Sequence, residues 1–176
     1  MITVEVIQMV VKANHDISSG LETAFINSAI NSNLAYRPEF VSNDYTQGKK
    51  VSVAIERELR HCDAFYISVA FITEGGLAPL KQVLAELRDK GIPGKILTTS
   101  YLTFTEPKAL KTLADLSNVE VRVYDSTDEG ATGFHTKGYI FKEEEIYRFI
   151  VGSSNMTASA FSVNKEWNTK LVSTSD

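Results

Sequence analysis

The sequence predicts an α/β fold, with a mixed and largely parallel sheet flanked by helices, on three observations. Residues 64–73 form an almost unbroken apolar, β-branched and aromatic run, which is typical of a central strand buried on both faces. Strand and helix patterns then alternate as far as residue 124, an order that implies right-handed parallel crossovers. Two further strand-like runs enclose the charged residues 142–145, which predicts a C-terminal antiparallel hairpin.

The individual strands are expected where β-branched and aromatic residues lie between polar or glycine-containing breaks. In chain order they cover residues 2–11, 64–73, 95–99, 119–124, 134–141, 147–151 and 167–172.

The helices are expected where apolar residues recur every three or four positions beside capping residues. They cover residues 19–31 and 50–61, a segment from Leu77 to a cap at Gly91, a segment opened by Thr105, Glu106 and Pro107, and a short turn at 157–161. Residues 40–49 are expected to form an ordered loop.

The composition describes an ordinary globular chain of 176 residues, with 43% apolar and 23% charged residues, which we interpret as one domain over residues 1–176. The net charge of −4 argues against a broad electrostatic footprint on nucleic acid but allows a local basic cleft. Cys62 is the single cysteine, so an intrachain disulfide and a cysteine metal cluster are excluded, and a reducing, cytoplasmic setting fits.

No apolar run is long enough to span a bilayer, and the N-terminus lacks a secretory signal pattern, so no membrane partner is expected. The chain ends directly after a strand-like run, which suggests a domain excised from a longer protein.

The predicted hairpin brings chemically useful side chains together. His135 and Lys137 are two residues apart on a strand and therefore point the same way. Folding back at residues 142–145 places Gly152 and Ser153 near His135, and the polar turn that carries Asn155 closes over this end. An imidazole, a cation, an amide and hydroxyls converge in a manner suited to a phosphate ester.

This pattern resembles the signature of the phospholipase D superfamily, in which HxK is followed by Asp after four residues and then by a G-S-x-N turn. Here the matching residues are His135, Lys137 and the turn 152–155, while Lys142 stands where the signature has Asp. With residues 68–73, 134–141 and 164–168, the chain is similar to the N-terminal phospholipase-D-like module of certain bacterial superfamily 2 helicases and restriction-like proteins. The resemblance covers roughly residues 20 to 172 and implies the phospholipase-D-like layered fold.

The resemblance implies a catalytic set of His135, Lys137, Asn155 and Glu166. A neutral imidazole can attack phosphorus and form a phosphohistidine, which divides one difficult step into two. The phosphate oxygens would be bound by Lys137, Ser153, Ser154 and Asn155. Glu166 would accept a hydrogen bond from the other imidazole nitrogen and fix its tautomer. This chemistry requires no metal and no cofactor.

Two histidines form the site in this family, and members with one motif form two-fold dimers. The resemblance therefore implies a homodimer in which one His135 attacks and the other protonates the leaving group. His15 and His61 are poor substitutes, because the first lies in a polar linker and the second at a helix end.

Simpler interpretations remain open for several residues. Glu166 could be an ordinary exposed carboxylate, and Ser153 and Ser154 could be turn residues. Trp167 is expected in the core rather than as a base-stacking platform, and Cys62 as a small buried residue. Ligands of such sheets bind beyond the carboxyl ends of strands, which singles out Thr73, Glu74, Ser100 and Tyr101.

The leading hypothesis is a metal-independent phosphodiesterase acting on DNA, the nuclease module of a helicase whose further domains lie downstream. The alternative is a weakly active or inactive module that dimerises its parent or positions DNA, which the acidic net charge and Lys142 favour. A lipid phosphodiesterase is a third possibility, although no basic amphipathic helix or anchor is found.

Overall fold

The computed structural model describes residues 38–125, 127 and 132–174. The predicted strand at 2–11, the predicted helix at 19–31 and His15 lie outside these residues.

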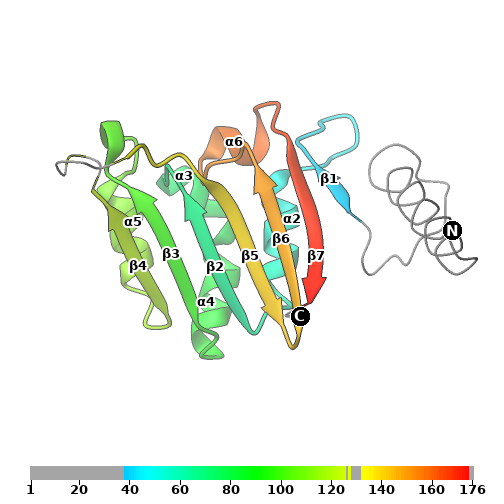
Figure 1. Cartoon of the computed structure of the whole chain (residues 1–176), viewed down its shortest axis with the longest axis horizontal. Coiled ribbons are helices and arrows are strands. Elements are labelled where there is room, and N and C mark those ends of the chain that lie inside the picture. Colours follow the sequence, from blue (N-terminus) through cyan, green and yellow to red (C-terminus); the bar gives the residue numbers. More distant parts are fainter. Residues whose placement is uncertain (1–37, 126, 128–131, 175–176) are drawn as a thin grey trace, which may run out of the picture.

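The described chain forms one seven-stranded mixed sheet with the strand order β1-β7-β6-β5-β2-β3-β4 (Figure 1). Parallel pairing joins β2 to β3 and β3 to β4, and every other neighbouring pair is antiparallel. The parallel part expected from the alternating pattern is therefore confined to three strands. The strands are β1 (Glu39–Val41), β2 (Ala64–Val69), β3 (Gly94–Thr99), β4 (Val119–Tyr124), β5 (Lys137–Glu143), β6 (Ile146–Gly152) and β7 (Asn168–Thr174).

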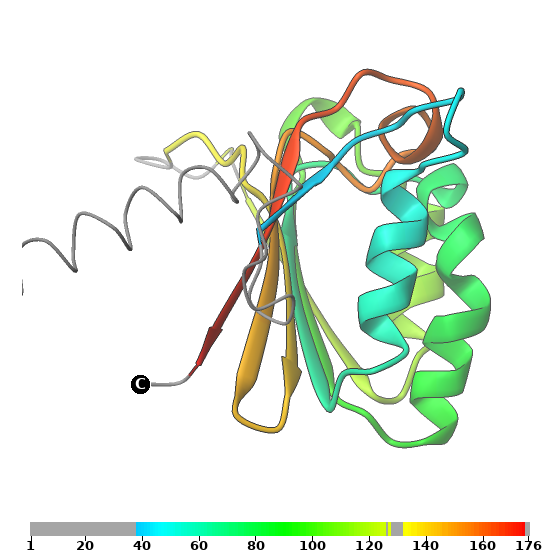
Figure 2. The same cartoon turned by 90° about the vertical axis from the view of Figure 1, so that its right-hand side faces the viewer.

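The described helices cover one face of the sheet, and none of them covers the other face, called the open face below (Figure 2). They are α2 (Val51–Leu59), α3 (Glu74–Leu77), α4 (Lys81–Asp89), α5 (Pro107–Ala114) and α6 (Ala158–Ser162), with 3-10 turns η3 (Ala78–Leu80) and η4 (Tyr101–Thr103). The core lies between these helices and the sheet and contains fully buried residues such as Ile55, Phe65, Leu80 and Phe141. Burying this apolar surface is the main source of the stability of the fold.

The one-sided helix layer corrects the expectation that residues 64–73 are buried on both faces. Tyr66 points to the open face and keeps 39% of its surface exposed, whereas its neighbours Phe65 and Ile67 are buried in the core. The strand also ends at Val69, and Thr73 already caps α3 by accepting a hydrogen bond from the amide of Gly76.

Most other predicted elements are present, with small differences at their ends. Residues 40 and 41 of the expected loop 40–49, together with Glu39, pair with β7 as the short strand β1. Gly91 ends the helical region with φ +69°, as a C-terminal cap requires. The residue that precedes α5 is Glu106, and Thr105 is buried instead, where its hydroxyl bonds to the carbonyl of Ala70.

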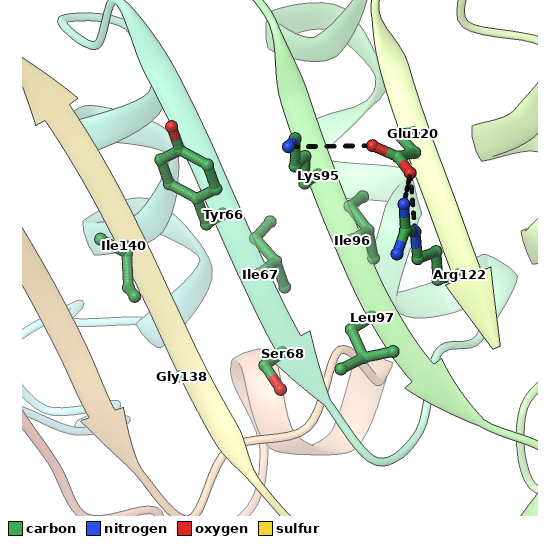
Figure 3. A pocket seen from close by; sticks show the side chains of 10 residues that line it. All are labelled: Tyr66, Ile67, Ser68, Lys95, Ile96, Leu97, Glu120, Arg122, Gly138 and Ile140. Carbon is green, nitrogen blue, oxygen red and sulfur yellow. Dashed lines mark hydrogen bonds and ion pairs between the residues drawn. The ribbon is translucent and has the colours of Figure 1, made fainter. Parts of the chain in front are cut away.

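A pocket of about 340 Å³ lies on the open face (Figure 3). It is lined by apolar residues of β2, β3 and β5, including Tyr66, Leu97 and Ile140, and bordered by the ion pairs of Glu120 with Lys95 and Arg122. It contains none of the predicted site residues. Within the described ranges, no helix has the length and apolar character needed to cross a bilayer.

Candidate active site

The predicted site residues gather at one end of the sheet, where β2 and β6 end and where β5 and β7 begin (Figure 1). The strand registers fix this arrangement, because Val69 pairs with Lys137, Gly138 with Val151, and Gly152 with Asn168. The hairpin expected from the sequence is therefore present, in a register that brings the two halves of the motif to the same edge.

His135 and Lys137 lie side by side at the start of β5. The ammonium nitrogen of Lys137 is 2.8 Å from Nδ1 of His135, and it also donates a hydrogen bond of 2.9 Å to the carbonyl oxygen of His135. His135 is exposed to solvent. The shared direction predicted for these two side chains is confirmed by this contact.

The strand begins three residues later than predicted, at Lys137 rather than Phe134. Thr136 is nevertheless held against β2, because its carbonyl accepts from the amide of Ala70 at 3.1 Å and its hydroxyl lies 2.6 Å from that of Ser68. These two contacts fix the backbone directly after His135.

Burial lowers the pKa of the Lys137 ammonium below its ordinary value, and the nearby negative charge of Glu166 partly opposes this shift. A partly desolvated ammonium attracts an anion more strongly than a fully hydrated one, because less water screens its charge.

The two serines in the turn after β6 differ in exposure and in hydrogen-bond partners. The exposed Ser153 donates its hydroxyl proton to Glu166 in a short hydrogen bond and accepts from the amide of Trp167 at 3.0 Å. Ser154 is fully buried, and its hydroxyl accepts from the Asn168 amide at 2.9 Å. The prediction that Ser154 contacts phosphate therefore does not fit its position, and Ser154 instead fixes the turn.

Asn155 is partly buried beside the end of β2. Its Oδ1 accepts a hydrogen bond of 3.2 Å from the amide of Phe71, an arrangement that orients the side-chain amide. In the described part of the chain no hydrogen bond uses Nδ2 of Asn155, so this group remains available as a donor to a bound anion.

Glu166 is 7% exposed, which removes the interpretation of an ordinary surface carboxylate. Its oxygens accept from Ser153 and, at 3.4 Å, from Asn164. Among the described residues no hydrogen bond joins Glu166 to His135, so the orienting role predicted for Glu166 stays a prediction.

Sequence reasoning missed aromatic residues at this edge. The ring of Phe71 lies 6.0 Å from that of His135, and Phe104 lies 5.0 Å from Phe71, both in edge-on geometry. The expectation that Trp167 is a core residue is wrong, because 75% of its surface is exposed. Trp167 points outward because the flanking Glu166 and Asn168 are buried, and neighbouring side chains on an extended backbone point to opposite sides.

Other residues singled out from the sequence lie outside the site. Thr73 caps α3, and Glu74 forms an ion pair with Lys81. His61 is at the opposite end of the sheet, after α2, and its Nδ1 is 2.8 Å from the carbonyl of Arg57. Cys62 is buried as expected, and burial raises the pKa of its thiol to about 11.

An HxK strand and a G-S-S-N turn at the same edge of a mixed α/β sheet define a phospholipase-D-like domain. The family described as "Cardiolipin synthase, PLD-like domain" matches residues 59–175, which is more than half of the chain. The chain therefore belongs to this family, and membership supports a function on phosphodiesters.

Among solved structures, phosphatidylserine synthase from Haemophilus influenzae Rd KW20 is similar with a TM-score of 0.60 and 12% identity, over 100% of this chain and 43% of that protein. This likeness shows the fold. A search of curated proteins gave no match.

Two other solved structures are less similar. An archaeal chromatin protein described with a mode of DNA binding has a TM-score of 0.46 and 15% identity, over 95% of this chain and 58% of that one. Polyphosphate kinase from Porphyromonas gingivalis has a TM-score of 0.47 and 12% identity, over 90% and 23%. The chain spans less than two thirds of each of the three proteins.

Proposed function

We propose that this domain is a metal-independent phosphodiesterase that cleaves DNA through a phosphohistidine on His135. The observation that carries the proposal is the direct contact of His135 with Lys137, at an edge shared with Ser153 and Asn155. Within the described residues, Nδ2 of Asn155 donates to no other group. An accessible imidazole beside anion-binding donors suits nucleophilic attack on a phosphodiester.

In the first step Nε2 of His135 attacks phosphorus, and the bond from phosphorus to the leaving oxygen breaks. The leaving oxygen takes a proton from an acid, and the phosphoryl group stays on His135. In the second step water attacks the same phosphorus, gives up a proton, and the nitrogen–phosphorus bond breaks. Lys137 and Asn155 would bind the non-bridging oxygens during both steps.

The resting contact between Lys137 and His135 has to change during this cycle. An ammonium that donates to Nδ1 leaves the proton of the neutral ring on Nε2, the nitrogen that must attack. A bound phosphate would attract the Lys137 ammonium away from Nδ1, since charge-assisted hydrogen bonds to phosphate are strong. Nδ1 could then take the proton and donate it to a carboxylate, and Glu166 is the nearby candidate.

The acid that protonates the leaving oxygen would come from a second copy of the chain. The other described histidine, His61, lies at the far end of the sheet. A two-fold dimer that places two His135 rings in one cleft would supply both nucleophile and acid. In this proposal the domain serves as the nuclease module of a helicase whose motor lies downstream.

A second candidate is a module that binds DNA or dimerises its parent without turnover. Lys142 favours it, because this residue occupies the Asp position of the family signature. The acidic net charge of −4 also favours it, since DNA binding usually requires basic surface.

The deciding experiment is cleavage of labelled DNA in excess EDTA by the wild-type chain and by His135→Ala, with His61→Ala as a matched control. We expect cleavage by the wild type and the His61 variant and none by the His135 variant. DNA binding without cleavage by any of the three would support the second candidate. Turnover of phospholipid vesicles in preference to DNA would instead assign a lipid phosphodiester substrate.

A further inference from the structure

The open face carries a continuous row of apolar side chains across four strands. Leu171 of β7 pairs with Phe149 of β6. Phe149 pairs with Ile140 of β5, and Ile140 pairs with Tyr66 of β2. Residues paired in this way lie side by side on the same face of a sheet. Leu171 and Tyr66, at the two ends of the row, are 40% and 39% exposed. Because folded proteins rarely leave an extended apolar surface in contact with water, the row is a candidate docking surface.

The apolar surface extends beyond both ends of this row. On the side of β1 lies Trp167, which is 75% exposed and whose ring meets that of Phe40 edge-on, with centroids 6.0 Å apart. On the side of β3 lies the pocket of about 340 Å³, where Leu97 joins Tyr66 and Ile140 (Figure 3). The surface therefore runs from β1 to β3, and a partner that covers it must present apolar side chains.

Residues 1–37 join the sheet beside this surface. They lead into the edge strand β1, whose residue Phe40 pairs with Thr169 of β7. Five of these 37 residues are charged, a smaller share than the 23% of the whole chain. The apolar side chains of a segment with so little charge are stabilised by leaving water. The segment and the open face are therefore complementary in chemistry and adjacent along the chain.

The helix expected at residues 19–31 has dimensions that match the row. Leu21 and Phe25 are four positions apart, with Ala24 beside them, and so share one face of that helix. At 1.5 Å per residue the helix would be about 20 Å long, whereas the distance from β7 to β2 is three strand spacings, about 14 Å. Residues 32–37 can span about 20 Å when extended, which suffices to connect such a helix to β1.

We propose that residues 19–31 form a helix that packs across the open face, with Leu21 and Phe25 against the row from Leu171 to Tyr66. A helix of this length is only marginally stable in water, so it needs such a surface. The sheet would then be covered on both faces, as is usual around parallel strands. This inference goes beyond the proposed function and constrains it. With the open face covered, a second copy of the chain has to approach at the end of the sheet where His135 lies.

The first test measures how fast a thiol on the open face reacts with iodoacetamide in the native full chain. Leu171→Cys is combined with Cys62→Ala, so that the new thiol is the only one. Val53→Cys in the same background is the matched control, because Val53 lies on α2 and is 55% exposed. Each rate is divided by that of the same chain unfolded in urea. We expect the Leu171→Cys thiol to react at least about tenfold more slowly than the control, because the helix must detach first. Equal rates would overturn the proposal.

The second test breaks the proposed contact from the side of the helix. Phe25→Asp puts a charge into the apolar interface and should restore the fast rate of the Leu171→Cys thiol. Asn27→Asp adds the same charge on the opposite side of the expected helix and should leave the slow rate unchanged. Slow reaction of the buried native Cys62 in a separate Phe25→Asp chain would show that the fold is intact. An equal effect of the two aspartates on the Leu171→Cys rate would contradict the predicted helix face.

Dilution distinguishes the chain's own segment from a second copy on the same surface. An intramolecular cover does not depend on concentration, so the slow rate of the Leu171→Cys thiol should persist when the protein is diluted about a hundredfold. Protection that is lost on dilution, together with dissociation of a dimer in sedimentation, would assign the open face to a second copy and overturn the proposal. None of these outcomes bears on phosphodiester cleavage, so the proposed function is tested separately.

Discussion

The ammonium nitrogen of Lys137 lies 2.8 Å from Nδ1 of His135 and donates to the carbonyl oxygen of the same residue. One lysine thus holds both the ring and the backbone of the proposed nucleophile. This contact makes Nδ1 an acceptor and puts the proton of the neutral ring on Nε2.

The tautomer of His135 is accordingly expected to change when an anion binds. In the free chain at pH 8, nitrogen NMR of labelled histidine should report the Nε2–H form. Tungstate, a phosphate analogue, should attract the Lys137 ammonium and convert the ring to the Nδ1–H form. An Nδ1–H ring in the free protein would show that the contact with Lys137 is not the resting arrangement.

The pH dependence of activity should report the lowered pKa of Lys137. Because the ammonium form binds phosphate, activity should fall as pH rises through this pKa, which lies below the ordinary value of 10.5. Lys137→Arg keeps its charge at higher pH, so the residual activity of this variant should decline only at more alkaline pH. Identical alkaline limbs for the two proteins would exclude Lys137 as the titrating group.

The same lowered pKa makes the free energy of unfolding rise with pH, whereas activity should fall with pH. Between the lowered native pKa and 10.5 the unfolded chain binds a proton that the native chain has lost, so the contribution of Lys137 to stability rises with pH. Urea unfolding of the wild type and Lys137→Met across this window separates this contribution from the loss of activity.

Gly152 is expected to tolerate no side chain. A Cβ atom there would lie 2.1 Å from the carbonyl oxygen of Trp167, which belongs to the backbone beside Ser153. Gly152→Ala should therefore cost about 1–3 kcal/mol of unfolding free energy and disturb the contact of Ser153 with Glu166. Gly138→Ala is the matched control, because its nearest neighbour would be Val151 at 3.9 Å. Equal stability of the two variants in urea would contradict this packing.

A buried ion pair should be the most sensitive point of the sheet–helix interface. Lys170 of β7 and Glu58 of α2 are each about 7% exposed or less, with their charged atoms 3.3 Å apart. Lys170→Met removes one partner and should cost about 3 kcal/mol, near the low end for such losses because Arg148 still faces Glu58. The double variant with Glu58→Met should recover most of this loss in urea unfolding. Failure to recover would indicate that Lys170 acts mainly through Glu39.

The hairpin was predictable because it depends on local pattern. Alternating side chains and a charged tip determine which residues of β5 and β6 share an edge, so the proximity of His135 to the turn with Ser153 follows from the sequence. The alternating helices and strands of residues 64–124 were predictable for the same reason.

Strands β2 and β7 were less predictable, because none of the described helices covers one face of the sheet. The sequence of β2 suggested burial on both sides, yet Tyr66 is exposed. In β7 and the two residues before it, polar side chains are buried and a large aromatic side chain is exposed, the reverse of the usual arrangement. Glu166, Asn168 and Lys170 point inward, where Ser153, Ser154 and Glu58 bind them. Trp167 therefore points outward. Polar partners from distant elements decide this orientation, and no local pattern reveals them.

The central claim, that His135 forms a covalent bond to phosphorus, is tested most directly by trapping the intermediate. The full chain is mixed with end-labelled DNA, quenched in alkali within the first turnover, digested and analysed by mass spectrometry. We predict a phosphodiester-linked nucleotide on the peptide that contains His135, stable in alkali and released by acid. Turnover that leaves no adduct on this peptide, or an adduct on a different residue, would contradict the account.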